Sequence, residues 1–172
     1  VSIDGCRAET NDPIRGEGTY SQIRQGLEVL KNLGFETSLT AAVTGTNIKE
    51  MAGLPDLAHD HGVRSIHLMW LHRRGRALES FDGLFPSNEE LLRLVRRIKR
   101  RADQLGVLFD NMESVRLRAN GQPGVKFDLG NACWDSLCLY SNGHLYPSAS
   151  FAGYRPLDIG RSEEHTSELQ SQ

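Results

Sequence analysis

The spacing of apolar and polar residues predicts three β-strands that alternate with three α-helices. Short apolar runs at residues 1–3, 37–43 and 65–71 are typical of strands. Apolar residues recur at helical spacing within residues 19–34, 47–62 and 87–105. The run at 65–71 is almost continuously apolar, as in parallel strands that are covered on both faces. Strand–helix units in this order predict an α/β fold with a parallel sheet, either open or part of a barrel.

Each expected helix opens on a pair of residues that can form a capping box. These pairs are Thr19 with Gln22, Asn47 with Glu50, and Ser87 with Glu90. Gly53 and Pro55 are expected to interrupt or restart the second helix, because neither residue suits a helix interior.

The pattern changes at about residue 112, and a β-hairpin is expected beyond it. Residues 136–140 and 144–146 alternate in polarity on either side of Asn142-Gly143. Asn-Gly between two such runs is a strong hairpin signal. We therefore place the boundary between the α/β region and a β-hairpin appendage somewhere between residues 112 and 130.

Composition narrows the possible functions mainly by exclusion. The chain has 20 Lys and Arg against 22 Asp and Glu, so net charge indicates neither a nucleic-acid nor a membrane partner. There is no apolar run of the ~18 residues that a membrane span needs. Neither a glycine-rich dinucleotide fingerprint nor a P-loop occurs. The three cysteines, Cys6, Cys133 and Cys138, form no disulfide framework, which favours a reducing, cytoplasmic setting.

Both ends of the chain are unusual. It opens without Met inside an expected strand, so we expect further sequence upstream. Residues 161–172 match the translation of a common sequencing-library adapter, and we interpret them as a non-native tail. Without this tail the basic and acidic residues number 19 each.

Several short motifs follow one another in an order that is informative as a series. Val1-Ser-Ile-Asp-Gly5 precedes Asn11-Asp-Pro-Ile-Arg-Gly-Glu-Gly18, and Thr44-Gly-Thr-Asn47 and Gly75-Arg-Ala77 come later. Cys133, Gly143 and Ser148 then fall on a C-x9-G-x4-C spacing, with serine in the last place. The series resembles radical S-adenosylmethionine enzymes that carry a SPASM-type C-terminal extension, such as sulfatase-maturase-like proteins.

The resemblance implies a domain organisation and a chemistry. Residues 1–120 would form the second half of a partial (β/α) barrel, residues 121–160 would begin the SPASM-like extension, and residues 161–172 would be the tail. The intact enzyme would use S-adenosylmethionine and a 4Fe–4S cluster to form a 5′-deoxyadenosyl radical. Its cluster ligands, a C-x3-C-x2-C loop, would lie upstream of residue 1, so the chain alone is expected to be inactive.

The resemblance also implies partners. Relatives of this kind often modify peptides or proteins, so a peptide or protein substrate is expected, with a flavodoxin or ferredoxin as electron donor. Cys133 would be a metal ligand of a possible auxiliary Fe–S cluster. Ser148 replaces the next expected thiolate, and serine is a poor ligand for such a cluster. Cys133 is therefore either a ligand of an auxiliary cluster or a structural cysteine.

The candidate site residues follow the ends of the expected strands, where α/β barrels place their active sites. Asp4 is the candidate catalytic residue, and Ser2 would bind the cofactor's carboxylate or ribose; alternatively, Asp4 only begins a turn with Gly5. Arg15 would clamp a carboxylate or, alternatively, pair with Asp12.

Three further cofactor-binding candidates lie in the later loops. Thr44 and Asn47 follow the second expected strand, although both could instead be helix caps. Arg76 follows the third strand and could equally be a solvated arginine. Cys6 is interpreted as an inert thiol, and His67 as a histidine with satisfied interior partners.

Two other functions fit the same residues. One is a different barrel enzyme that uses Asp4 as an acid or base, for which the sequence offers no evident partner residue. The other is a non-catalytic α/β protein that binds a peptide at the hairpin edge.

Overall fold

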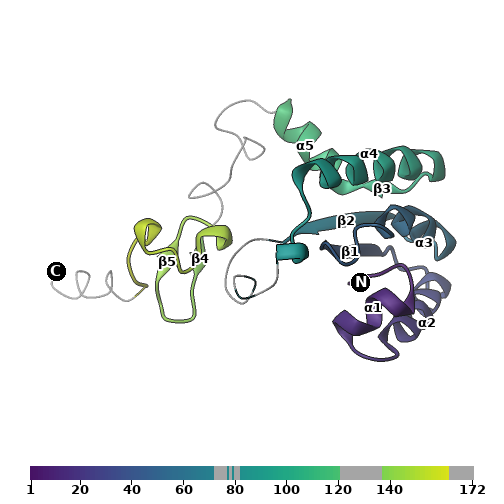
Figure 1. The fold of residues 1–172 in the computed structure, drawn as a ribbon, viewed down its shortest axis with the longest axis horizontal. Coiled ribbons are helices and arrows are strands. Elements are labelled where there is room, and N and C mark those ends of the chain that lie inside the picture. Colours follow the sequence, from purple (N-terminus) through teal and green to yellow (C-terminus); the bar gives the residue numbers. More distant parts are fainter. Residues whose placement is uncertain (72–76, 78, 80–81, 121–136, 163–172) are drawn as a thin grey trace. The chain divides into compact units, whose positions relative to one another are not determined.

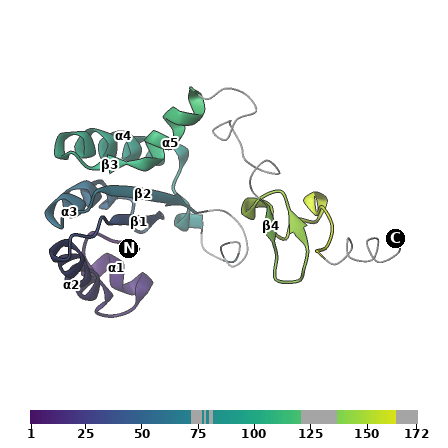
Figure 2. The same ribbon diagram turned by 180° about the vertical axis from the view of Figure 1, so that it is seen from behind.

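The computed structural model describes residues 1–71, 77, 79, 82–120 and 137–162. It divides into two units, Val1–Glu113 and Ser114–Gln172, which are described separately below. The first unit is built around a parallel sheet with helices, and the second contains a small antiparallel sheet (Figures 1 and 2). The α/β class and the hairpin that the sequence predicts are therefore confirmed.

The sheet of the first unit has the order β1-β2-β3, and all of its pairings are parallel. The strands are β1 (Ser38–Val43), β2 (Ser65–Trp70) and β3 (Leu108–Phe109). The start of the chain runs parallel to β1, since Ile3 N donates to Thr40 O at 2.9 Å and Thr40 N donates to Val1 O at 2.9 Å. The predicted strands at 37–43 and 65–71 are thus confirmed as β1 and β2. Residues 1–3, which we call the first strand, pair with β1 only through an isolated bridge at Ser2. The sequence pattern did not predict β3, which is only two residues long.

The helices connect and cover these strands. They are α1 (Ala8–Arg15), α2 (Thr19–Asn32), α3 (Leu54–Asp60), α4 (Asn88–Leu105) and α5 (Asp110–Ala119). α1 is not among the predicted helices, because its residues are mostly polar and Pro13 interrupts the helical pattern. α3 begins with Pro55 in its first turn, which confirms the predicted restart after Gly53.

Only one of the three predicted capping boxes is present. Ser87 accepts from Glu90 N at 3.2 Å, and Glu90 accepts from Ser87 N at 2.9 Å. The Thr19 prediction is wrong: Thr19 is the first residue of α2, and its hydroxyl donates to Gly16 O at 2.7 Å. Asn47 caps no helix either, because turns and a short 3₁₀ helix, Met51–Gly53, precede α3.

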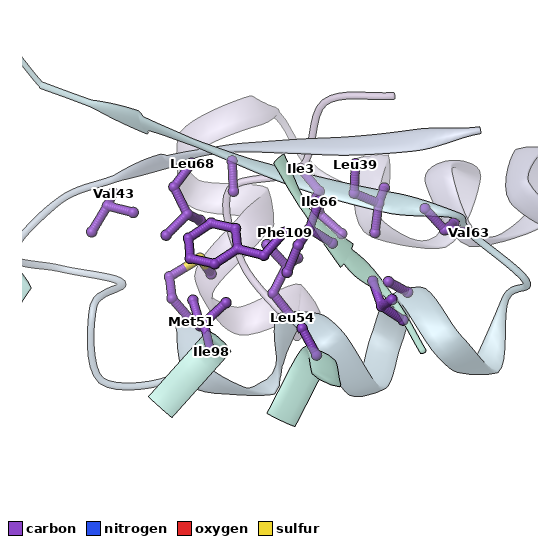
Figure 3. Close-up of a cluster of buried hydrophobic side chains, with 14 of the residues drawn as sticks. Ile3, Leu39, Val43, Met51, Leu54, Val63, Ile66, Leu68, Ile98 and Phe109 are labelled. Carbon is purple, nitrogen blue, oxygen red and sulfur yellow. The ribbon is translucent and has the colours of Figure 1, made fainter. Parts of the chain in front are cut away.

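The hydrophobic core lies on one face of the sheet, between the strands and the helices (Figure 3). Its central residues are fully or almost fully buried: Ile3, Leu39, Val43, Met51, Leu54, Ile66, Leu68, Ile98 and Phe109. The side chains between them in sequence form the opposite face, which we call the open face (Ser2, Thr40, His67 and Met69). Met69 is 53% exposed. β2 is therefore buried on one face within the described residues, and the prediction that both its faces are covered was wrong.

The second unit contains the predicted hairpin. β4 (Cys138–Leu139) pairs antiparallel with β5 (Leu145–Tyr146). Gly143 has a φ of 84°, a left-handed conformation that favours glycine in such a turn. Arg161 and Ser162, the first residues of the expected tail, pair with this hairpin, and Ser162 N donates to Gly143 O at 3.0 Å. Among the described helices, none is long and apolar enough to cross a membrane.

Candidate cofactor-binding edge of the sheet

Asp4 lies at the end of the first strand and ties three segments together. Its Oδ1 accepts from Ala42 N at 2.9 Å, so the side chain continues the strand pairing with β1. Its Oδ2 lies 3.3 Å from Arg15 Nη1, and the Asp4 side chain is 13% exposed. Arg15 therefore pairs with Asp4 and not with Asp12, the local partner considered from the sequence. Both Asp4 oxygens have partners, which suits a positioning role better than proton transfer.

Asn47 is fully buried and links the ends of the first strand and β1. Its Nδ2 donates to Asp4 O at 2.9 Å and to Ala42 O at 2.8 Å. Its Oδ1 accepts from Thr44 N at 2.8 Å. Both N–H donors of the Asn47 amide are thus bonded within the protein, and its side chain is fully buried, so Asn47 does not offer a donor to a ligand.

The Thr44 hydroxyl lies 2.7 Å from the Thr46 hydroxyl, at a more exposed position. A hydroxyl has one donor and two acceptor positions, so this pairing leaves capacity for a further polar contact. Thr44, unlike Asn47, could therefore contact a ligand at the end of β1.

A second set of bonds joins α1 and α2 beneath Asp4. Asp12 accepts from Gly18 N at 2.9 Å and from Tyr20 N at 2.8 Å, so it caps α2 from the neighbouring helix. Hydrogen bonds from Asn11 first, and then from Tyr20, lower the pKa of Asp12. Asn11 is itself fully buried, and its Oδ1 accepts from Asp4 N at 3.0 Å. We call this set of residues the edge network: Asp4, Asn11, Asp12, Arg15 and Asn47.

Asn11 opens the motif that ends at Gly18, but it was not among the predicted site residues. The motif does not reveal that the amide of Asn11 reaches Asp4. Gly5 allows the first strand and α1 to come close enough for this contact. A Cβ at Gly5 would lie 2.5 Å from Asn11 N, so only glycine fits between the first strand and α1.

Cys6 directly follows Gly5, and its thiol is unreactive. Burial, reinforced by the Glu50 carboxylate, raises the pKa of its thiol to about 12. Its backbone is fixed on both sides, because Cys6 N donates to Glu50 Oε1 at 2.8 Å and the Tyr20 hydroxyl donates to Cys6 O at 2.6 Å. The thiol stays protonated near neutral pH, in line with the interpretation of an inert cysteine.

A hollow of about 650 Å³ opens beside the edge network. Its lining residues come from the first strand, α1 and α2: Ser2, Asp4, Ile14, Arg15, Thr19, Gln22 and Ile23. The Arg15 guanidinium has five N–H donors, and its pairing with Asp4 leaves others available. Ser2 is exposed and adds a hydroxyl. This combination suits a ligand that carries a carboxylate and hydroxyl groups.

The other sequence-predicted site residues are not gathered here. Arg76 and Cys133 lie outside the described residues. Ser148 belongs to the second unit, where it precedes the 3₁₀ helix Ala149–Phe151. In the described part of the chain, no three His, Cys, Asp or Glu side chains are grouped so that they could hold a metal ion.

Comparison with curated proteins finds relatives of two kinds. Mycofactocin maturase MftC of Mycolicibacterium smegmatis is 32% identical over 91 residues, which are 52% of this chain and 23% of the maturase. AdoMet-dependent heme synthase of Methanosarcina barkeri is 35% identical over 91 residues, 52% of this chain and 26% of the synthase. The heme synthase of Oleidesulfovibrio alaskensis is 34% identical over 80 residues, 46% of this chain and 21% of the synthase.

The aligned part of the chain thus spans about a quarter of the length of the first two relatives. No family model matches the chain. Both kinds of relative are radical S-adenosylmethionine enzymes. The resemblance inferred from the ordered motifs is therefore confirmed at the level of that enzyme class.

Proposed function

We propose that this chain is part of a radical S-adenosylmethionine enzyme and that the hollow beside the edge network contributes to binding S-adenosylmethionine. The supporting observation is that relatives with two different names, a maturase and an AdoMet-dependent heme synthase, match the chain at 32% and 35% identity. Their names differ in product, so what they share with this chain is the cofactor chemistry. When bound and reduced by one electron from a 4Fe–4S cluster, S-adenosylmethionine would supply methionine and a 5′-deoxyadenosyl radical.

The residues of the hollow fit the amino-acid and ribose portions of this cofactor. Arg15, held by Asp4, would pair with the methionyl carboxylate, since a guanidinium binds carboxylates through two parallel N–H donors. Ser2 would contact the carboxylate or a ribose hydroxyl, and Thr44 would add a hydroxyl at the end of β1. Asp4 and Asn47 would orient these groups, because their own polar atoms are used within the protein.

The ligands of the 4Fe–4S cluster are proposed to lie outside the described residues. Of the described cysteines, Cys6 is free but has a raised thiol pKa, and Cys138 lies in the hairpin. A cluster needs thiolates, so a buried thiol with a pKa of about 12 is a poor ligand. Cys133 as a ligand of an auxiliary cluster, and the SPASM-type character of the second unit, remain proposals based on sequence spacing.

The substrate proposal is a peptide or protein, supported by the maturase among the relatives. A flavodoxin or ferredoxin is proposed as electron donor, and the cytoplasm as the setting. The alternative in which Asp4 is a general acid or base gains no support, because both of its oxygens are already bonded.

The test uses the full-length protein, reconstituted anaerobically with iron and sulfide and reduced with dithionite. Formation of 5′-deoxyadenosine from S-adenosylmethionine is the expected result. Arg15→Gln should raise the KM for S-adenosylmethionine about tenfold, the cost of losing a charge-assisted hydrogen bond. Arg93→Gln is the matched control, since Arg93 lies exposed on α4 and pairs with Glu89. A cluster-loaded protein that forms no 5′-deoxyadenosine would refute the proposal.

A further inference from the structure

His67 and Asp110 form a pair on the open face of the sheet that the proposed cofactor site does not use. His67 Nδ1 lies 2.7 Å from Asp110 Oδ1. Ile66 pairs with Phe109, so the next residues, His67 in β2 and Asp110 at the start of α5, lie side by side. Their side chains are 41% and 40% exposed, so the pair faces outward and is not part of the core.

The contact with Asp110 determines which ring nitrogen of His67 carries the proton. A carboxylate only accepts hydrogen bonds, so the neutral imidazole must donate from Nδ1. Its Nε2 then carries a lone pair, and within the described part of the chain no residue is bonded to that atom. His67 is therefore arranged to accept a hydrogen bond from a molecule on the open face.

The pair is not needed to attach α5 to the sheet. Asn111 performs that role: its Oδ1 accepts from Leu68 N at 2.7 Å, and its Nδ2 donates to Leu68 O at 2.9 Å. A polar side-chain pair that is two-fifths exposed stabilises a fold little, because water competes for its hydrogen bond. A role in stabilising the fold therefore does not explain the contact between His67 and Asp110.

The pair also lies in line with the proposed cofactor site. Ser2 bridges to Thr40, and Thr40 pairs with His67, so one row of residues crosses the open face from Ser2 to Asp110. Neighbouring strands are about 4.8 Å apart, which puts the backbones of Ser2 and His67 roughly 10 Å apart. The row thus connects His67 with Ser2, which lines the hollow.

We propose that His67, oriented by Asp110, is a substrate-binding site that accepts a hydrogen bond from an O–H or N–H group of the substrate and takes its proton. In that step the substrate's O–H or N–H bond breaks and the electron pair stays on the substrate. The proton binds to His67 Nε2, and the Asp110 carboxylate pairs with the imidazolium that forms. This inference rests on the proposed function, because it assumes that the open face carries the reaction.

The experiment is histidine-selective ¹⁵N NMR on the full-length protein with small probes in place of the unidentified substrate. Phenol and N-methylacetamide are the O–H and N–H donors, and acetate is the acceptor control. Both donors should shift the His67 Nε2 resonance, and acetate should not. His61 is the internal control, since its ring is 7% exposed and both nitrogens are bonded, to Glu28 and to Arg24. Its resonances should stay unchanged with every probe.

Two variants test the assignment. His67→Gln should remove the donor-responsive resonance and leave the His61 resonances unchanged. Asp110→Asn should keep the ring and give a mixture of both tautomers in the ¹⁵N spectrum, with a smaller response to the donors.

Three results would overturn the assignment: no response of His67 to either donor, a response to acetate instead, or a donor response that persists in His67→Gln. A wild-type protein that forms no 5′-deoxyadenosine overturns the proposed function, and the probe response of His67 still reports on the pair alone.

Discussion

Replacing Asn47 by alanine removes the link between the ends of the first strand and β1. The side chain is fully buried and makes three hydrogen bonds, to Thr44 N, Asp4 O and Ala42 O, at 2.8, 2.9 and 2.8 Å. Alanine cannot replace any of these hydrogen bonds, so the Thr44 N–H loses its acceptor and the Asp4 and Ala42 carbonyls each lose an N–H donor. Each buried polar group left without a partner costs about 1–3 kcal/mol.

We therefore expect Asn47→Ala to lower the free energy of unfolding by about 3–5 kcal/mol. In a chain of this size that corresponds to a fall of roughly 10 °C in the thermal midpoint. Urea unfolding monitored by circular dichroism measures the first quantity, and calorimetry measures the second. Asn32→Ala is the matched control, because Asn32 is exposed at the end of α2 and should change stability by less than about 0.5 kcal/mol.

Asn47→Asp tests the same geometry with a pH dependence. The new carboxylate keeps an acceptor for Thr44 N but turns an oxygen toward the Asp4 and Ala42 carbonyls. Burial and these carbonyls should raise the pKa of the new group above its unfolded value. The variant should then be least stable at neutral pH and regain stability as the pH falls and the group is protonated. An Asn47→Ala protein within 1 kcal/mol of wild type would refute the role of this residue.

Two more predictions concern Gly5 and Cys6. Gly5→Ala should destabilise the protein by about 1–3 kcal/mol, because the new Cβ would lie 2.5 Å from Asn11 N. Gly26→Ala is the control, since open space surrounds Gly26 within α2 and alanine should be neutral or stabilising there. Urea unfolding of both variants measures the two changes in stability, and equal changes would contradict the prediction. Cys6 should react with iodoacetamide near neutral pH about a thousandfold more slowly than a thiol of pKa 9.0, because burial raises its own pKa to about 12. Peptide mapping measures the labelling rate, with Cys138 as the internal comparison. Equal labelling of the two cysteines would contradict the burial of the Cys6 thiol.

The sequence predicted those elements whose signals are local. β1, β2, α2, α4 and the hairpin each carry a clear apolar period or a turn sequence, and Ser87 caps α4 as its spacing indicated. β3 is too short to show a period, and its pairing with β2 depends on residues more than forty positions away.

The errors arose where a distant side chain does what a local one was expected to do. Thr19 looked like the cap of α2, yet the capping carboxylate belongs to Asp12 in α1. Asn47 looked like the cap of a helix, yet its amide bonds to the ends of two strands. Single-sequence spacing rules describe contacts within one turn of a helix and carry no information about such partners.

Residues of one motif can serve either the fold or a ligand. Of the residues that carry the resemblance, Gly5 and Asn47 serve the fold: Gly5 lets the first strand and α1 come close, and Asn47 is fully buried with both N–H donors bonded to the backbone. Arg15 and Ser2 keep free donors and line the hollow. The motifs therefore predict the fold through the first group and the chemistry only through the second. Substitutions in the first group should lower stability, whereas substitutions in the second should change ligand affinity at nearly constant stability.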